Sequence, residues 1–240
     1  MNILITGGSS GLGKAIVYAL SSLTQNKIFF TYNKHSNDAD VLVRERHNTI
    51  ALKCDFTNTD EIRELEAAIP TFDLDVLINN AYVGTPQGKH FHKTDSASFL
   101  KMFENNLIPT IRITQQALSG FRKKKYGKII NILTAYLVNV PPTGLCIYTA
   151  NKAYLQQLSK SWSNEYAQYN ISSNCISPEF MFTNLAPDLD ERIIEQIQDR
   201  HPMKKLLTPA EVADTVVYLV NASQQVNGAH IVINAAQNIL

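Results

Sequence analysis

Short apolar runs that alternate with helical segments constrain the fold of this chain more than any other feature. The runs are too short for helices and lack an alternation of polar and apolar residues, which is typical of strands buried on both faces of a parallel sheet. They are residues 3–5, 28–30, 50–52, 76–78, 129–133, 171–176 and 231–233. The pattern predicts an α/β fold with a single doubly wound parallel sheet of the Rossmann type, about seven strands and helices on both faces.

Most segments between these runs have the features of helices. Residues 59–69 carry acidic residues in their first turn and apolar residues at helical spacing. Residues 209–220 begin with Pro209 directly after Thr208, a combination that is typical of a helix start. Further helices are expected at residues 14–23, 98–121 and 147–169.

The chain has 240 residues and contains no linker, repeat or low-complexity stretch, so we expect one domain over residues 1–240. The segment 180–203 interrupts the alternation and contains Pro187 and Pro202. Long connections of this kind often cover a binding site. We therefore treat residues 180–203 as a candidate substrate flap.

Charge and composition exclude several classes of protein. The 22 basic and 21 acidic side chains give a net charge of +1, too little to attract a nucleic acid. No apolar run approaches the ~20 residues that span a bilayer, and the N-terminus lacks the features of a signal peptide. Because Cys54, Cys146 and Cys175 are far apart, neither a disulfide framework nor a metal site is expected. We expect a cytoplasmic protein that binds no membrane.

A glycine-rich turn follows the first predicted strand, with the sequence TGGSSGLG at residues 6–13. Glycine allows unusual backbone angles and a close approach of phosphate, and the N-terminus of the next helix offers N–H groups to an anion. The turn could be an ordinary connection, but its position between the first strand and the first helix favours a nucleotide site. The candidate cofactor-binding residues are Gly7, Ser9, Ser10, Gly11, Leu12 and Gly13.

The end of the second predicted strand bears on the choice of cofactor. An acidic residue there favours a free ribose 2′-hydroxyl, whereas a basic residue favours a 2′-phosphate. No acidic residue occurs before Asp38, while Asn33, Lys34 and also His35 could bind a phosphate. We therefore predict NADP(H) over NAD(H), with a merely solvated Lys34 as the alternative.

Tyr148 and Lys152 lie four residues apart, so they share one face of a predicted helix. Such a pair taken alone is more often a surface contact. Here it belongs to a longer series in which the chain resembles the short-chain dehydrogenase/reductase family, and within it the 3-oxoacyl-carrier-protein reductases. The matching pieces, in family order, are Thr6-Gly7 with Gly11 and Gly13, Asp55, Asn79-Asn80-Ala81, Asn106-Leu107, residues 130–134 ending in Thr134, the Tyr148/Lys152 pair, and Ser177-Pro178 followed by Thr183.

This resemblance implies an NAD(P)-dependent oxidoreductase that interconverts a ketone and a secondary alcohol. Tyr148 would be the general acid and base, and a nearby Lys152 ammonium would lower the pKa of the phenol. Thr134 would bind the substrate oxygen, and Asn106 would hold a water behind the lysine. Hydride transfer would belong to the nicotinamide cofactor.

The resemblance also implies cofactor contacts beyond the glycine turn. Tyr148 and Lys152 would contact the nicotinamide half, and Lys152 would bind its ribose. The other implied cofactor-binding residues are Asp55, Phe56, Asn79, Ala81, Pro178 and Thr183. The amides of Asn79 and Asn80 could equally tie neighbouring loops together.

Three positions depart from the family pattern. Tyr82 replaces the glycine that usually ends the Asn-Asn-Ala motif, Thr134 replaces the usual serine, and Glu179 replaces the glycine after Pro178. These departures leave a second hypothesis open, a cofactor-binding regulatory or scaffold protein with weak or no activity. For the enzyme, a 3-oxoacyl thioester is the first candidate among small-molecule substrates, and the resemblance implies a homo-oligomer, either a dimer or a tetramer.

Overall fold

The computed structural model describes residues 1–86, 88–181 and 190–237. A sheet of seven parallel strands has the order β3-β2-β1-β4-β5-β6-β7. The strands are β1 (Asn2–Ile5), β2 (Lys27–Tyr32), β3 (Thr49–Lys53), β4 (Val76–Asn79), β5 (Gly127–Ile132), β6 (Ile171–Pro178) and β7 (His230–Ile233). The direction of the strand order reverses between β1 and β4, and in such sheets ligands bind beyond the carboxyl ends of the strands at this point.

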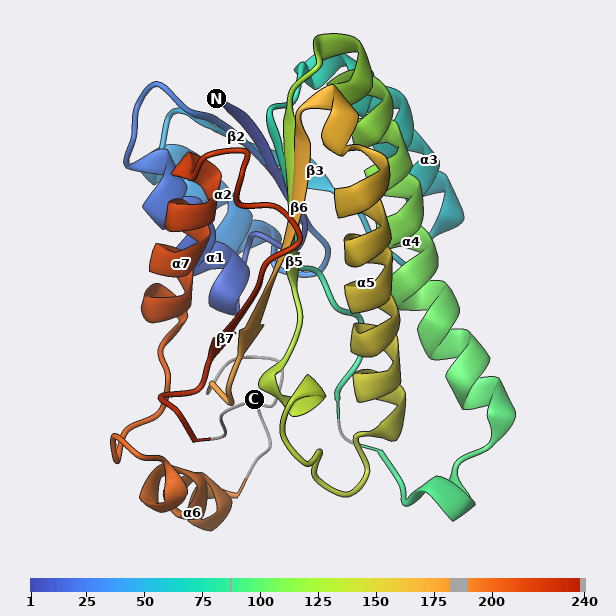
Figure 1. Cartoon of the computed structure of the whole chain (residues 1–240), viewed down its shortest axis with the longest axis vertical. Coiled ribbons are helices and arrows are strands. Elements are labelled where there is room, and N and C mark those ends of the chain that lie inside the picture. Colours follow the sequence, from blue (N-terminus) through green and yellow to red (C-terminus); the bar gives the residue numbers. More distant parts are fainter. Residues whose placement is uncertain (87, 182–189, 238–240) are drawn as a thin grey trace.

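Helices cover both faces of the sheet (Figure 1). One face carries α1 (Gly11–Ser21), α2 (Ser36–Glu45) and α7 (Pro209–Asn221), and the other carries α3 (Thr59–Ala68), α4 (Ser96–Lys124) and α5 (Cys146–Glu165). Helix α6 (Glu191–Arg200) lies below the carboxyl ends of the strands in Figure 1. Four short 3₁₀ helices complete the described elements: η1 (Ile69–Phe72), η2 (Phe91–Lys93), η3 (Ala135–Leu137) and η4 (Ala167–Tyr169). No described helix is long and apolar enough to cross a membrane.

The predicted fold class is confirmed, and each predicted strand is found at its place. Two helices, α2 and α6, were not predicted from the sequence. Helix α2 is short and buries only Ala39 and Leu42, so it has little apolar periodicity to detect. Helix α6 falls inside the segment 180–203 that we treated as a flap. Whether that segment moves stays a prediction, and residues 182–189 lie outside the described part of the chain.

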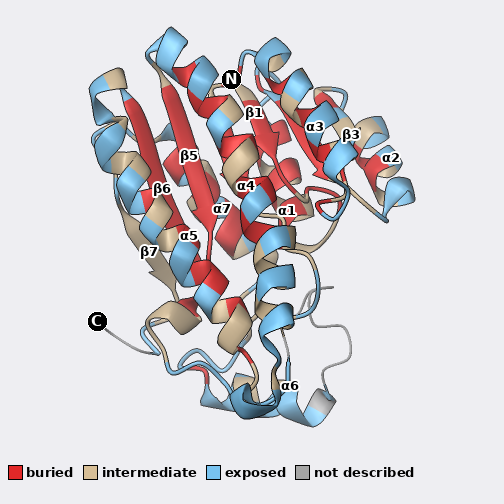
Figure 2. Ribbon diagram, turned by 90° about the vertical axis from the view of Figure 1, so that its right-hand side faces the viewer, coloured by how far each residue is buried: buried red, intermediate tan, exposed pale blue. Residues whose placement is uncertain are grey.

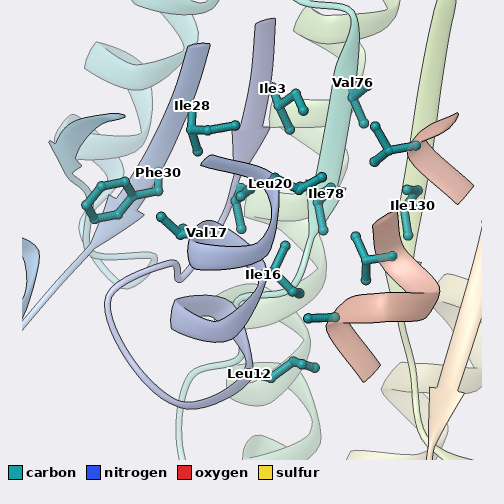
Figure 3. Packing of buried hydrophobic residues seen from close by; sticks show 14 of the residues in the cluster. Ile3, Leu12, Ile16, Val17, Leu20, Ile28, Phe30, Val76, Ile78 and Ile130 are labelled. Carbon is teal, nitrogen blue, oxygen red and sulfur yellow. The ribbon is translucent and has the colours of Figure 1, made fainter. Parts of the chain in front are cut away.

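Helix α1 packs its apolar face against the centre of the sheet. Its residues Ile16, Val17 and Leu20 are fully buried and point toward side chains of β1, β2 and β4 (Figure 3). Burial of each such side chain contributes about 1.5–3 kcal/mol to stability. The central strands are buried between the two helical layers, whereas the edge strand β7 is half-buried and the outer helix faces are exposed (Figure 2). This packing fixes the N-terminus of α1 at the edge where the strands end.

A buried polar network ties α4 and α5 to the middle of the sheet. Asn79 Nδ2 donates to Asn131 Oδ1 at 2.9 Å and to Thr114 Oγ1 at 3.1 Å. Asn131 Nδ2 in turn donates to Ser159 Oγ at 3.0 Å. Hydrogen bonds are stronger in the interior than in water, and these join α4 and α5 to β4 and β5, although Asn79 Oδ1 has no partner among the described residues. The network therefore holds α5, which carries Tyr148, in a fixed position on the sheet.

A buried lysine at the start of β5 holds the end of α7. Lys128 is 4% exposed, and its Nζ donates to the carbonyl oxygens of Val220 at 2.7 Å, Leu219 at 3.3 Å and also Ala222. Burial lowers the pKa of the Lys128 ammonium. The last carbonyls of a helix lack partners within the helix and attract cations, so Lys128 serves as the cap of α7.

We expect Lys128→Met to destabilise the protein by about 1–3 kcal/mol, because it leaves buried carbonyls without their donor. The measurement is urea unfolding followed by circular dichroism. Lys123→Met on the exposed end of α4 is the matched control, with an expected change below about 0.5 kcal/mol. Equal stability of both variants would show that α7 does not depend on this cap.

Candidate active site

A cavity of about 630 Å³ opens at the carboxyl edge of the sheet. The glycine turn and the ends of β2, β4, β5 and β6 line it, together with the start of α5 and one side of α6. Its place agrees with the rule for open parallel sheets, in which ligands bind where the strand order reverses. Fourteen of the residues that the sequence singled out line this cavity: Gly7, Ser9, Ser10, Gly11, Leu12, Gly13, Asn33, Lys34, Phe56, Ala81, Thr134, Tyr148, Lys152 and Pro178.

The glycine turn has the backbone geometry of an anion cradle. Gly7 has φ +68° and Gly11 has φ +51°, a region that residues with side chains rarely adopt. Ser10 caps α1 without a hydrogen bond from its side chain, so the first-turn N–H groups keep their capacity for a ligand. Helix N-termini with such groups stabilise phosphate.

Asn80 fixes this turn to the sheet. Its Nδ2 donates to the carbonyl oxygens of Thr6 at 2.9 Å and Gly7 at 3.1 Å. The Thr6 hydroxyl accepts from the backbone N–H groups of Asn80 and Ala81, each at 3.0 Å. The structural role that we left open is therefore confirmed for the Asn80 amide, which ties the loop after β4 to the glycine turn. The side chain of Asn79 points into the buried network and does not line the cavity.

Asp55 lies beside the end of β2 but outside the cavity lining. Its Oδ1 accepts from the backbone N–H and the hydroxyl of Thr57, both at 2.8 Å. Burial acts to raise the pKa of Asp55, but the hydrogen bonds from Thr57 and Asn33 and the charge of Lys34 outweigh it and lower that pKa. Asn33, Lys34 and Asp55 therefore form one polar group at the rim of the cavity.

Thr134, Tyr148 and Lys152 meet in a buried corner of the cavity, where each is at most 7% exposed. Burial raises the pKa of Tyr148 to about 12, while Thr134 acts to lower it and Tyr136 to raise it. The expected lowering of this pKa by Lys152 is thus not found, because burial disfavours the phenolate more strongly than its surroundings favour it.

Lys152 is itself strongly affected by burial. Its Nζ donates to the carbonyl oxygen of Ile132 at 2.7 Å. Burial lowers the pKa of the ammonium to about 8, and the Cys175 thiol acts in the opposite direction. Desolvation therefore moves the two pKa values apart, because it raises that of the phenol and lowers that of the ammonium.

Asn106 does not line the cavity, and its side chain is fully engaged with the backbone. Its Oδ1 accepts from Val83 N–H at 2.7 Å, and its Nδ2 donates to the carbonyl oxygens of Val83 at 3.2 Å and Met102 at 3.0 Å. The side chain thus fixes the loop after β4. Its role in holding a water stays a prediction. Thr183 lies outside the described residues.

Glu179 brings a carboxylate into the cavity at a position where the family usually has glycine. It is 8% exposed, and its Oε2 accepts from Asn139 Nδ2 at 2.8 Å. Burial raises the pKa of this carboxyl group, against the hydrogen bonds from Phe180 N–H and Asn139. The same carboxyl group acts to raise the pKa of Tyr136, so it lies near the buried corner.

Sequence reasoning missed several residues of the site. Ile193 and Ile197 of α6 line the cavity, and their spacing of four residues was the available signal of a helix with one apolar face. Tyr136 and Phe180, which follow β5 and β6, also line the cavity. The position of Tyr82 against Tyr148 depends on two distant segments, so no local pattern shows it.

Comparison with known proteins agrees with this site. The sequence model of the family described as enoyl-(acyl carrier protein) reductase matches residues 7–235. Nodulation protein G of Rhizobium sp. (strain N33) is 30% identical over 235 residues, which cover 96% of this chain and 94% of that protein. A 3-oxoacyl-(acyl-carrier-protein) reductase of Rickettsia felis is 29% identical over 218 residues, which cover 91% of this chain and 88% of that protein.

Solved structures show the same architecture. A protein from Agrobacterium tumefaciens, assigned provisionally as a gluconate dehydrogenase, superposes with a TM-score of 0.89 at 28% sequence identity. The superposition covers 100% of this chain and 96% of the other. Likeness over the whole length shows that the two chains share this fold.

The glycine turn provides a direct test of close packing at the site. A Cβ on Gly13 would lie 2.0 Å from the Gly7 carbonyl oxygen, whereas a Cβ on Gly120 in α4 would meet nothing within 4 Å. We expect Gly13→Ala to destabilise the protein by about 1–3 kcal/mol or more. Gly120→Ala should be neutral or stabilise it by up to about 1 kcal/mol. Urea unfolding measures both, and equal effects would contradict the close approach of α1 to the turn.

Proposed function

Because the chain belongs to the short-chain dehydrogenase/reductase family of NAD(P)-dependent enzymes, we propose that it interconverts a ketone and a secondary alcohol with NADP(H), using Tyr148 as general acid and base. The observation that carries the proposal is the meeting of Thr134, Tyr148 and Lys152 in the cavity that also contains the glycine turn. A cofactor seated on the turn and a substrate at Tyr148 would share this one space.

The residues of the cavity fit a dinucleotide. The free N–H groups at the start of α1 suit a pyrophosphate, and Asn33 and Lys34 suit a phosphate on the adenosine ribose. Lys152 and the segment after Pro178 would hold the nicotinamide half, with Phe56 and Ala81 beside the adenosine half. When bound, the nicotinamide supplies the hydride chemistry.

The pKa values favour a clear division of roles in the reductive direction. With a pKa of about 12, the Tyr148 phenol carries its proton at neutral pH and can donate it to the carbonyl oxygen as negative charge develops there. The Thr134 hydroxyl would donate a second hydrogen bond to the same oxygen. The Lys152 ammonium would then stabilise the phenolate that remains on Tyr148.

The substrate class follows from the relatives and from Glu179. The 3-oxoacyl-(acyl-carrier-protein) reductase of Rickettsia felis makes a 3-oxoacyl thioester our first candidate. A carboxyl group at Glu179 disfavours an anionic group close to the reacting carbon, and it offers an acceptor to a hydroxyl or an amine. A sugar, steroid or polyketide-like ketone fits these groups as well, so a substrate panel should include neutral polyhydroxy compounds.

The proposal extends to the location and the partners of the enzyme. We place the enzyme in the cytoplasm, acting on a small molecule, with no nucleic acid or membrane as partner. We expect it to form a homo-oligomer, either a dimer or a tetramer. Sedimentation at micromolar concentration measures this state directly.

We expect Tyr148→Phe to lower kcat by at least about 100-fold, because the proton donor of the transition state is lost. NADPH affinity, measured by calorimetry, should stay within about threefold of the wild type, because the ring remains. The assay follows NADPH oxidation with acetoacetyl-coenzyme A, a cyclic ketone and a keto sugar. Tyr126→Phe, at the opposite end of the sheet, is the control.

Two outcomes of this assay would redirect the proposal. Full turnover by Tyr148→Phe would contradict the role of Tyr148. NADPH binding by the wild type without turnover of any compound would favour the regulatory or scaffold role that the replacements at Tyr82 and Glu179 suggest.

We expect Lys34→Glu to weaken NADPH binding by about 10- to 100-fold, because a charged hydrogen bond to phosphate is lost and a repulsive charge is added. NADH affinity should fall far less or rise. Calorimetric titration with both cofactors measures the two constants. Lys27→Glu at the other end of β2 makes the same change of charge away from the cavity, and an equal loss there would rule out a phosphate site at Lys34.

A further inference from the structure

Tyr82 lies directly against the proposed proton donor. It follows β4 at the position where the family usually has glycine, and its side chain lines the cavity. The rings of Tyr82 and Tyr148 meet edge to face, with centroids 5.0 Å apart and planes at 83°. This arrangement is among the favoured geometries of aromatic pairs. A large aromatic side chain thus fills the space beside Tyr148.

The same ring contacts the Lys152 ammonium. Lys152 Nζ lies 5.4 Å from the centroid of Tyr82 and 5.9 Å from the centroid of Tyr148, both within the range of cation–π attraction. Among the described residues, its single hydrogen bond is the one to the Ile132 carbonyl oxygen. Two tyrosine rings therefore flank an ammonium that has lost most of its water.

The ring of Tyr82, and not its hydroxyl, contacts Tyr148 and Lys152. The hydroxyl is buried beside the Asn151 side chain, but the two groups are not aligned for a full hydrogen bond, and neither the hydroxyl nor Asn151 Nδ2 has another partner among the described residues. Burial raises the pKa of the Tyr82 phenol, against a smaller effect of Asn151, so this side chain stays neutral. The next residue, Val83, is held on both backbone groups by Asn106, which fixes the backbone directly after Tyr82.

We propose that Tyr82 is a positioning residue, whose ring holds the Tyr148 phenol in orientation and keeps the buried Lys152 in its charged form. This inference rests on the proposed function of Tyr148 and Lys152. It gives a role to a residue that departs from the family pattern, and it explains why a large ring is accommodated at the base of the cavity.

The described groups around Lys152 and Tyr148 include no carboxylate that could stabilise the charge of Lys152 in place of the Tyr82 ring. Lys152 faces Tyr82, Tyr148, the Ile132 carbonyl group and, from β6, the Cys175 thiol. No carboxylate is among the described groups that act on its pKa. On its other sides, Tyr148 faces Thr134 and Tyr136, with Glu179 beyond Tyr136. The negative face of an aromatic ring is then the available counterpart of the ammonium.

The test replaces the ring with a branched aliphatic side chain, Tyr82→Leu. Reduction needs a charged Lys152, so kcat/KM for the carbonyl compound falls as pH rises through the pKa of Lys152. Loss of the ring lowers that pKa, so the fall should begin about 0.5 to 1 pH unit lower. Tyr82→Phe keeps the ring and should restore the wild-type profile.

The same titration is also read without turnover, from the pH dependence of NADPH affinity. Tyr82→Met is a second aliphatic variant in case Tyr82→Leu folds poorly, and Tyr126→Leu reports the effect of losing a half-buried tyrosine elsewhere. A shift in the aliphatic variants alone supports the proposal. No shift, or an equal shift in Tyr82→Phe, overturns it.

The parallel measurement on Tyr148→Phe separates the two proposals. If Tyr148→Phe retains turnover, the proposed function fails, while the NADPH titration still decides whether Tyr82 sustains the charge of Lys152. If Tyr148→Phe is inactive and the aliphatic Tyr82 variants keep the wild-type profile, only the role of Tyr82 is refuted.

Discussion

The common direction of the seven strands is the constraint on which the rest of the molecule depends. Because all strands are parallel, their carboxyl ends meet at one edge, and the reversal of strand order between β1 and β4 leaves room there for a ligand. The glycine turn, the end of β2, Thr134 after β5 and Pro178 at the end of β6 all reach this edge. Residues that are far apart in the sequence thus share one cavity without any special local arrangement.

The strand positions and many cavity residues could be predicted from the sequence. The strands were predictable because burial on both faces requires apolar residues. Strands covered on both faces need continuous apolar runs, so their positions were visible before the structure was known. The cavity residues of the glycine turn and of α5 were visible because each lies in a local motif. Helix α2 was not, since it buries only Ala39 and Leu42.

What the sequence could not provide are contacts and environments set by distant segments. The side chains of Asn79 and Asn106 bind Asn131 and the backbone of Val83, contacts that no local motif predicts. The sign of the pKa shift at Tyr148 was also missed, because a pair of residue types does not reveal how deeply the pair is buried. The contact between Tyr82 and Tyr148 joins the loop after β4 to α5, and no motif spans that distance.

The burial of Tyr148 and Lys152 connects these findings. A buried phenol holds its proton, which suits donation to a carbonyl oxygen, whereas a buried ammonium tends to lose its charge. Reduction needs both groups protonated, so the same burial helps one partner and harms the other. On our proposal, the ring of Tyr82 would resolve this conflict without a carboxylate beside Lys152. A carboxylate there would weaken the ability of Lys152 to stabilise the phenolate. A chain with Tyr82 is on this argument better suited to reduction than to oxidation.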